Sequence, residues 1–186
     1  MFRSECKAGT DLGRLACSIL SGGGLVGDGV VNAILAQRIS LPEFSSGFLL
    51  DGYPRTLPQG LFLDELLKQR GSMPVVSIHL DVPFPVIVNR ITSRQQCPRC
   101  SHIYNLLYQP PRAAGVCDDD GARLITRADD REAVVWQRLK LYEEQTGPVI
   151  CHYAKSDRHY RIDGGLAPAE VSARIEAALL SCAALV

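Results

Sequence analysis

Apolar residues recur every three or four positions over much of the chain, which is the spacing of an amphipathic helix. Leu12, Leu15 and Ile19 share one helical face, and the glycine run at 22–24 ends this first stretch. By the same pattern, helices are expected over residues 12–20, 28–39, 56–71 and 86–93, from 129 to beyond 142, and over 168–185.

Two of these helices carry a candidate N-terminal cap. Asp28 precedes the apolar run of the second helix and can accept hydrogen bonds from its free backbone N–H groups. Thr56 begins the third helix, and Gln59 follows at the spacing of a capping box, in which two side chains satisfy backbone N–H groups reciprocally. From this spacing alone, Gln59 is interpreted as a capping residue.

Three short segments that lead to an aspartate predict strands, and the first two are apolar runs typical of buried strands. They cover residues 47–50, 75–80 and 159–163, and they end at Asp51, Asp81 and Asp163. Because these strands alternate with helices, the sequence predicts an α/β fold with a parallel sheet. Asp51 would lie in a loop at the carboxyl end of its strand, where such sheets bind ligands.

Residues 95–126 interrupt this alternation. Pro, Gly, Cys, Tyr and Asp dominate the segment, and its few apolar residues fit short hairpin strands. The sequence therefore predicts core structure over residues 1–94, a small β-rich lid over residues 95–126, and a return to the core over residues 127–186.

Composition excludes some classes of function. Hydrophobic residues make up 46% and charged residues 22%, which is ordinary globular usage and excludes a disordered chain. The formal net charge is +0, so the chain lacks the basic field with which proteins hold nucleic acid or anionic membranes. No apolar signal-peptide core follows Met1, and we expect a cytoplasmic protein with no nucleic-acid or membrane partner.

The lid segment contains a candidate metal site. Cys97, Cys100, Cys117 and Asp120 follow the pattern C-x2-C-x16-C-x2-D, in which two turns each supply a pair of ligands to a tetrahedral Zn²⁺. A polar segment of this size cannot build its own core, so a bound metal would supply stability. Competing candidates for the fourth ligand position are His102, Asp118 and Asp119.

The segment from Asp51 to Arg55 is a candidate phosphate site. Asp51 could hold Mg²⁺ through water, Gly52 permits close approach to the backbone, and the forked Arg55 guanidinium can bind a phosphate. The same residue types also make an ordinary strand-to-helix turn, so spacing alone leaves both interpretations open. Further arginines flank the lid, where they could converge on a ligand: Arg90, Arg94, Arg127 and Arg138.

A series of motifs identifies a family resemblance. In chain order they are GFLLDGYPRTLPQ, LDVPFPVIVNRITSR, CPRC, GVCDDDG, RADDREAVVWQRL and YEEQTGPVI. Together they resemble adenylate kinase in its long form, with a zinc-bearing lid, over essentially the whole chain. The resemblance implies a P-loop-kinase-like parallel core, the reaction ATP + AMP = 2 ADP with Mg²⁺, structural Zn²⁺ in the lid, and a monomer whose partners are ATP, AMP and ADP.

The resemblance also assigns roles to matching positions. For AMP, it places Arg3 and Arg55 on the phosphate, Gln59 on the adenine, and Val26 and Gly52 beside the nucleotide. For ATP, it implies Arg90 on the adenine, with Arg94 and Tyr104 also in contact. Around the transferring phosphoryl group it implies Arg94, Arg127 and Arg138, with Asp51 organising the water around Mg²⁺ and with Asp129 and Asp130 aiding lid closure. Arginines suit this chemistry because charge spreads over the phosphate oxygens in the transition state.

One family motif does not occur in these 186 residues. It is G-x-x-x-x-G-K-[ST], the P-loop whose backbone amides and lysine bind the phosphates of ATP. Met1–Arg3 align with the middle of an AMP-site helix, so we expect an N-terminally truncated member whose core lacks the first two strands and whose phosphoryl transfer is impaired. The alternatives are a non-catalytic, zinc-bearing remnant that binds AMP, and a nucleoside monophosphate kinase of another base specificity.

Overall fold

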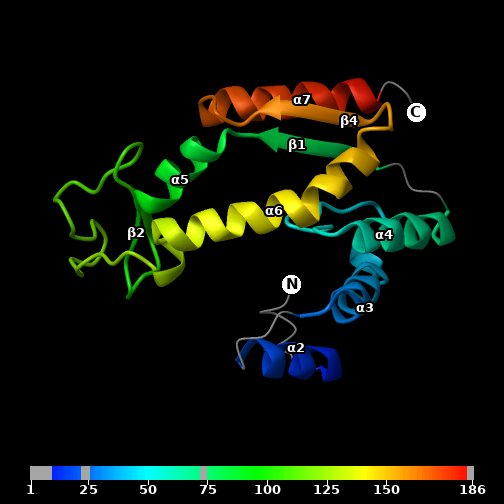
Figure 1. Cartoon of the computed structure of the whole chain (residues 1–186), viewed down its shortest axis with the longest axis horizontal. Coiled ribbons are helices and arrows are strands. Elements are labelled where there is room, and N and C mark those ends of the chain that lie inside the picture. Colours follow the sequence, from blue (N-terminus) through cyan, green and yellow to red (C-terminus); the bar gives the residue numbers. More distant parts are fainter. Residues whose placement is uncertain (1–9, 22–25, 72–74, 184–186) are drawn as a thin grey trace. The chain divides into compact units, whose positions relative to one another are not determined.

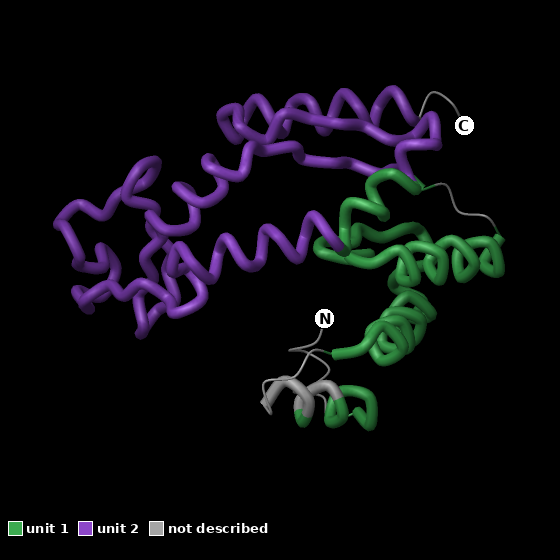
Figure 2. Tube along the Cα trace, viewed as in Figure 1, with its two compact units in different colours: residues 1–75, 145–152 green, residues 76–144, 153–186 purple. Residues whose placement is uncertain are grey.

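The computed structural model describes residues 10–21, 26–71 and 75–183. The chain divides into two compact units, which Figure 2 colours separately. Unit 1 comprises residues 1–75 and 145–152, and unit 2 comprises residues 76–144 and 153–186. The predicted lid lies within unit 2.

Unit 1 is built from helices. It contains α2 (Asp11–Ser21), α3 (Asp28–Ile39), the short 3-10 helix η1 (Pro42–Phe44) and α4 (Leu57–Gln69), together with residues 145–152 of the long helix α6 (Glu132–Tyr153). The predicted helices over these segments are confirmed, with ends shifted by one or two residues.

The core of unit 1 forms between α3 and α4. Leu35 and Ile39 lie one turn apart on α3, and Leu63 and Leu67 lie one turn apart on α4, so each pair projects from a single helix face. All four side chains are buried and in contact, which fixes the two helices against each other.

A pair of parallel strands anchors unit 2. Strand β1 (Ser77–Asp81) pairs with β4 (His159–Asp163) in a register that places Ser77 opposite His159 and Asp81 opposite Asp163. Helix α7 (Pro168–Ala183) runs alongside β4 and contacts it (Figure 1). The crossover between the strands contains α5 (Phe84–Thr92), the lid and α6, as parallel pairing requires a long connection.

A second small core joins α5 to the first part of α6. Val88 of α5 packs with Val135 and Leu139 of α6, and all three are buried. This contact ties together the two ends of the lid, because α5 leads into it and α6 leads out.

The lid itself contains a short antiparallel hairpin. Strand β2 (Arg94–Gln96) pairs with β3 (Ile103–Asn105), and an isolated bridge joins Gln96 to Ile125 farther along the chain. The 3-10 helix η2 (Ala128–Asp130) then connects the lid to α6. The parallel pair and this hairpin together make a mixed α/β fold, and the hairpin expected in the lid is confirmed.

The strand predicted over residues 47–50 is wrong. These residues belong to no strand, since no described residue supplies a ladder partner for them. Phe48 and Leu50 pack against the core of unit 1, whereas Leu49 between them is 90% exposed. The run therefore alternates like a half-covered strand and is not buried on both faces.

The cap predicted for Asp28 is also wrong. The N-cap of α3 is Gly27, and no side chain caps this helix. The Asp28 carboxylate is engaged by Thr56 and Gln59 of a neighbouring segment, which leaves it no role at its own helix end.

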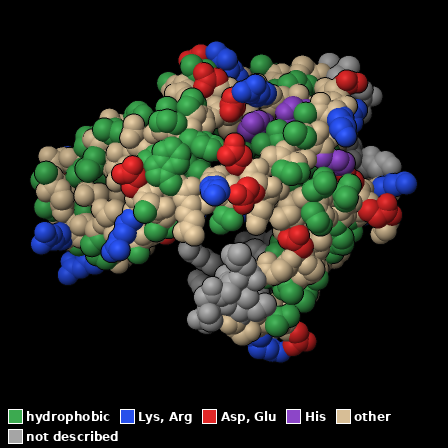
Figure 3. All heavy atoms as spheres, viewed as in Figure 1, with side chains coloured by type: hydrophobic (Ala, Val, Ile, Leu, Met, Phe, Trp, Pro, Cys, Tyr) green, Lys and Arg blue, Asp and Glu red, His purple; other side chains and the backbone are tan. Residues whose placement is uncertain are grey.

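Acidic and basic side chains both occur on the face drawn in Figure 3, in keeping with a net charge of +0. Among the described helices, none combines the length and the apolar character needed to span a bilayer.

Candidate functional site

Gly52 and Arg55 form a tight turn just before α4. Gly52 adopts a φ of 72°, in the left-handed region that glycine tolerates best. The Nε atom of Arg55 donates a hydrogen bond to the Gly52 carbonyl oxygen at 2.7 Å. A Cβ atom at position 52 would lie 2.8 Å from Arg55 Nη2, so any side chain there would displace the guanidinium.

The Gln59 side chain is held at both ends of its amide. Only 5% of Gln59 is exposed. Its Oε1 atom accepts a hydrogen bond from the Arg55 backbone N–H at 2.8 Å, and its Nε2 atom donates to Asp28 Oδ1 at 2.6 Å. The second carboxylate oxygen of Asp28 accepts a hydrogen bond from Thr56 Oγ1 at 2.7 Å. The network joins the first turn of α3 to the turn that carries Arg55.

The capping box predicted for Thr56 and Gln59 is half formed. Thr56 is the N-cap of α4, and its Oγ1 atom accepts the backbone N–H of Gln59 at 3.3 Å. The side chain of Gln59 goes instead to Asp28 and to the backbone of Arg55. Capping therefore explains why Thr56 stands at its position, but it does not explain Gln59.

Tyr53 adds a half-buried donor to the same network. Its hydroxyl donates to Asn32 Oδ1 at 2.7 Å and lies 3.1 Å from the carbonyl oxygen of Gln59. Burial, and then the negative charge of Asp28, raise the pKa of Tyr53 well above its usual value. The phenol consequently stays protonated, and remains a donor, throughout the neutral range.

The other residues expected around AMP or Mg²⁺ are less constrained. Asp51 is exposed, directly before Gly52, and Val26 is half-buried, just before α3. Arg3 lies outside the described residues, so its contact with the AMP phosphate stays a prediction.

In unit 2, Arg94 and Asp130 form a bidentate ion pair. Arg94 Nε donates to Asp130 Oδ2 at 2.9 Å, and its Nη2 atom donates to the other carboxylate oxygen. Asp130 is 1% exposed, so this guanidinium replaces the water that the carboxylate has lost. The hydrogen bond to Asp130 also raises the pKa of Arg94 above its ordinary value.

Arg90 is fixed by backbone oxygens. Its Nη1 atom donates to the carbonyl of Gly164 at 2.7 Å and its Nη2 atom to that of Gly165 at 3.0 Å. The guanidinium carbon also lies 5.6 Å from the centre of the Tyr108 ring. Arg90 thus ties the end of α5 to the loop after β4.

Arg127 and Arg138 differ in how they are held. The Nε atom of Arg127 donates to the side-chain oxygen of Gln96, at the base of the lid hairpin. Arg138 is exposed on α6 and makes no ion pair with a residue that the structure describes.

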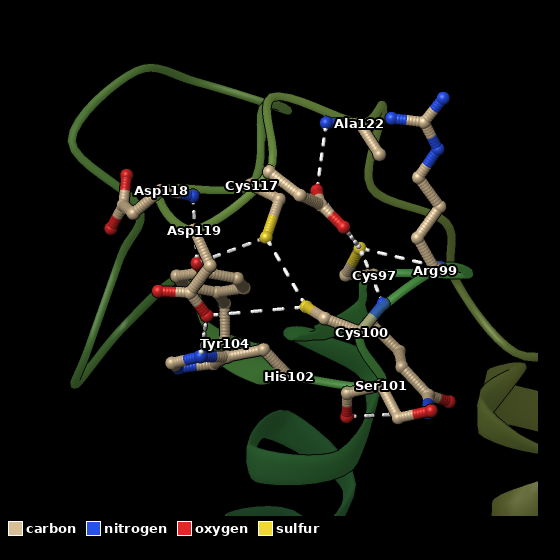
Figure 4. A network of polar contacts seen from close by, with 12 residues as sticks. Cys97, Arg99, Cys100, Ser101, His102, Tyr104, Cys117, Asp118, Asp119 and Ala122 are labelled. Carbon is tan, nitrogen blue, oxygen red and sulfur yellow. Dashed lines mark hydrogen bonds and ion pairs between the residues drawn. The ribbon is translucent and has the colours of Figure 1, made fainter.

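The lid brings together the four predicted metal ligands. One ligand atom from each of Cys97, Cys100, Cys117 and Asp120 lies within 4.8 Å of all the others. The Sγ atoms of Cys100 and Cys117 are 3.6 Å apart, and Cys97 Sγ lies 3.3 Å from Asp120 Oδ2. Figure 4 shows the three thiols directed toward one another. This cluster could hold a metal ion such as zinc.

Backbone N–H groups surround the cluster and favour anionic ligands. Those of Arg99 and Cys100 each approach Cys97 Sγ at 3.4 Å. The backbone N–H of Ala122 donates to Asp120 Oδ1 at 2.9 Å, and this hydrogen bond lowers the pKa of that carboxyl against the opposing effect of burial. Asp120 is therefore ionised at neutral pH, as a metal ligand must be.

The competing candidates for the fourth ligand have other partners. His102 Nδ1 lies 2.6 Å from Asp119 Oδ2, and Asp118 Oδ1 accepts the backbone N–H of Arg112 at 2.9 Å. Asp119 Oδ2 also lies 3.9 Å from Cys100 Sγ, so this carboxylate borders the cluster without joining it.

Tyr104 lies in the core of the lid. Its side chain is buried, its hydroxyl accepts the backbone N–H of Asp118 at 2.8 Å, and the same oxygen lies 3.5 Å from Cys117 Sγ. The ring stacks on His102 with the ring centres 4.5 Å apart. The contact of Tyr104 with ATP stays a prediction, since its hydroxyl serves the lid in this structure.

Sequence reasoning missed the residues that support Gln59. Asp28 appeared to be a helix cap, and neither Asn32 nor Tyr53 was singled out, although they link α3 to the Arg55 turn. The sequence holds no local signal for these links, because the hydrogen bonds between α3 and the Arg55 turn join residues more than twenty positions apart and form only when α3 packs on α4.

Comparison with known proteins finds one family whose sequences this chain resembles. The family model of adenylate kinase matches residues 1–158. The adenylate kinase of Thermosipho melanesiensis is 45% identical over 166 residues, which cover 89% of this chain and 78% of that relative. The adenylate kinase of Trichlorobacter lovleyi is 43% identical over 180 residues, which cover 97% of this chain and 84% of that relative.

Removal of the Arg94 guanidinium should destabilise unit 2. Arg94→Ala would leave the buried Asp130 carboxylate without its partner, at a cost of about 3–5 kcal/mol in the free energy of unfolding. Urea denaturation of the variant measures this loss. The matched control is Arg138→Ala, which removes an exposed arginine from the same unit and should change stability by less than about 0.5 kcal/mol. Equal effects of the two substitutions would contradict a structural role for the ion pair.

Proposed function

The chain belongs to the adenylate kinase family, and on that premise we propose that unit 1 binds AMP and that the arginines of unit 2 bind the phosphates of ATP. The family reaction is ATP + AMP = 2 ADP. The observation that carries the proposal is the fixed turn of Gly52, Arg55 and Gln59, which holds a guanidinium and an amide in defined places beside an exposed aspartate.

The AMP phosphate is assigned to Arg55 and the adenine to Gln59. Arg55 uses only its Nε group within the described part of unit 1, so its Nη groups can fork onto phosphate oxygens. Gly52 lets the phosphate approach the backbone, and Val26 and Arg3 complete the site. Preorganisation of Arg55 by the Gly52 carbonyl reduces the side-chain ordering that binding requires.

The transferring phosphoryl group is assigned to Arg94, Arg127 and Arg138. A guanidinium has five N–H donors, and Asp130 occupies two of those on Arg94, which leaves three for phosphate oxygens. Such arginines would stabilise the charge that spreads over these oxygens in the transition state. Arg90, whose guanidinium is held by two backbone carbonyls, is assigned to the ATP adenine.

Two metal ions are assigned to separate places. Mg²⁺, when bound with ATP, neutralises phosphate charge, and Asp51 would hold its water shell; this side chain is exposed and makes no hydrogen bond with a described residue. Zn²⁺ is assigned to Cys97, Cys100, Cys117 and Asp120, because three thiolates and a carboxylate match its preferred tetrahedral set. Its role is structural, since all four positions are filled by protein.

Turnover should depend on residues that supply a P-loop. A polypeptide of residues 1–186 alone is expected to make ADP from ATP and AMP far more slowly than the same residues joined to the P-loop segment of an adenylate kinase relative, because these residues contain no G-x-x-x-x-G-K motif. The measurement is the rate of AMP-dependent ADP formation by each polypeptide, after purification has removed the adenylate kinase of the expression host. Robust ADP formation by residues 1–186 would contradict this expectation, and AMP binding without turnover in either polypeptide would favour a non-catalytic AMP-binding protein.

Replacement of Arg55 should weaken AMP binding specifically through the phosphate. Arg55→Ala is expected to raise the AMP dissociation constant by about 10–150-fold, the loss expected for a charged hydrogen bond. Arg55→Lys should recover little of it because the fork is lost. Calorimetric titration with AMP and with adenosine makes the test sharp, since adenosine has no phosphate and its affinity should not change. Arg38→Ala is the control, as Arg38 pairs with Glu43 in the same unit; a similar loss there would contradict the assignment.

The lid should hold one zinc ion whose loss loosens the lid. Cys100→Ser is expected to abolish stoichiometric zinc in elemental analysis and to speed backbone hydrogen exchange over residues 95–126. AMP affinity should be unchanged, because no AMP residue lies in this segment. Cys151→Ser, which removes an exposed thiol outside the cluster, is the matched control and should retain zinc. Zinc well below one equivalent in the unmodified chain would refute the site.

A further inference from the structure

The Gln59 amide can adopt only one orientation in its network. A carboxylate accepts hydrogen bonds and cannot donate them, so the atom that faces Asp28 Oδ1 at 2.6 Å must be the Nε2 donor. A backbone N–H donates and cannot accept, so the atom that faces Arg55 N at 2.8 Å must be the Oε1 acceptor. A flipped amide would turn two oxygens toward each other at Asp28 and two N–H groups toward each other at Arg55.

Asp28 contributes more to this lock than Arg55 does. Its contact with Nε2 is charge-assisted and short, and such bonds are roughly twice as strong as neutral ones. The carboxylate is itself oriented, because its other oxygen accepts the Thr56 hydroxyl at 2.7 Å. Since Gln59 is 5% exposed, water cannot readily replace a lost partner.

The locked Gln59 amide can still make one hydrogen bond as a donor and one as an acceptor. Nε2 has a second N–H and Oε1 has a second lone pair, and these present one donor and one acceptor in a fixed order. Adenine offers an N6 amino donor beside a ring-nitrogen acceptor, which is the pattern that a glutamine amide pairs with. On the same edge, hypoxanthine carries a carbonyl acceptor in place of the amino group and an N1–H donor in place of the ring acceptor, so it would need the amide in the opposite orientation.

We propose that Asp28 is a positioning residue that fixes the Gln59 amide in the orientation that accepts adenine and rejects hypoxanthine. The proposal rests on the assignment of Gln59 to the adenine of AMP. Asp28 touches no substrate atom in this account; it acts by making the flipped amide unfavourable.

The test compares equilibrium binding of AMP and IMP to the chain. The unmodified chain should prefer AMP by about tenfold or more. Asp28→Ala should reduce that preference at least about threefold, chiefly by tighter IMP binding, since only the weaker Arg55 contact then opposes the flipped amide. Asp28→Asn should preserve most of the preference because its carbonyl oxygen can still accept from Nε2. Asp64→Ala is the matched control: it removes another carboxylate of unit 1, one that pairs with His152 and not with Gln59.

The outcomes separate the two levels of the proposal. If Gln59→Ala leaves the preference unchanged, or the unmodified chain has none, the adenine assignment itself fails. If Gln59→Ala abolishes the preference while Asp28→Ala leaves it intact, the adenine assignment stands and the positioning role of Asp28 is overturned. If Asp64→Ala lowers the preference as much as Asp28→Ala does, the effect is general destabilisation and the positioning role is again overturned.

A measurement on the unmodified chain covers the case in which Asp28→Ala does not fold. The side-chain amide protons of Gln59 should exchange with solvent at least about tenfold more slowly than those of Gln69 in the same ¹⁵N spectrum. Gln69 is a suitable internal reference because its Nε2 also donates to a carboxylate, that of Glu65, at 3.1 Å but on the surface. Equal exchange rates for the two glutamines would overturn the lock.

Discussion

A carboxylate withdrawn from water must find donors within the protein, and in each unit one such carboxylate organises the residues around it. Asp130 is almost wholly buried, and its carboxylate accepts two hydrogen bonds from the Arg94 guanidinium. Asp28 is partly buried and takes the Gln59 amide and the Thr56 hydroxyl. Arg94 and Gln59 are residues assigned to the nucleotides, and Thr56 directly follows another, Arg55. The hydrogen bonds that satisfy the two carboxylates therefore also fix the positions of side chains in the proposed site.

The lid has too few apolar side chains to be stabilised by a hydrophobic core alone, and its thiols would provide another source of stability. Its buried cluster consists of Cys97, Tyr104, Cys117 and Leu124, so two of its four members are thiols. Burial of so few apolar groups cannot offset the entropy of ordering some thirty residues. A metal held by thiolates would supply the missing free energy, and backbone N–H groups already directed at Cys97 would limit the cost of the negative charge that it requires.

Elements with strong local signals were predictable from the sequence, and long-range polar contacts were not. Strand β4 and helix α3 match their predicted spans because apolar spacing and flanking breakers act locally. The Thr56 cap was equally local. The strand predicted from the apolar run at 47–50 is wrong, because a strand forms only where a neighbouring strand pairs with it, and no local pattern specifies that neighbour.

In the candidate site, too, residues with local sequence signals were predictable and those with long-range contacts were not. The thiols of the lid were found from spacing, since paired ligands in two turns leave a repeat in the sequence. Asp28 was misread because an aspartate before a helical run has the same local pattern whether it caps that helix or reaches a distant glutamine. Only the packing of α3 on α4 distinguishes the two, and that contact joins segments far apart in the chain.

The way each arginine is held has a consequence for phosphate binding. Arg55, Arg90 and Arg127 are oriented by neutral oxygens, which fix the guanidinium without cancelling its charge. Arg94 is oriented by a carboxylate, which fixes it more firmly but offsets part of its attraction for phosphate. A neutral acceptor therefore suits an arginine that must attract an anion, and an ionic partner suits one whose position matters more than its charge. Arg138, exposed and without an ion pair among the described residues, keeps its full charge, but it would lose side-chain freedom on binding a phosphate as proposed. In the role proposed for them, these arginines would span the range from precise placement to free charge, and phosphoryl transfer needs both, because the phosphate must first be attracted and then be held in line.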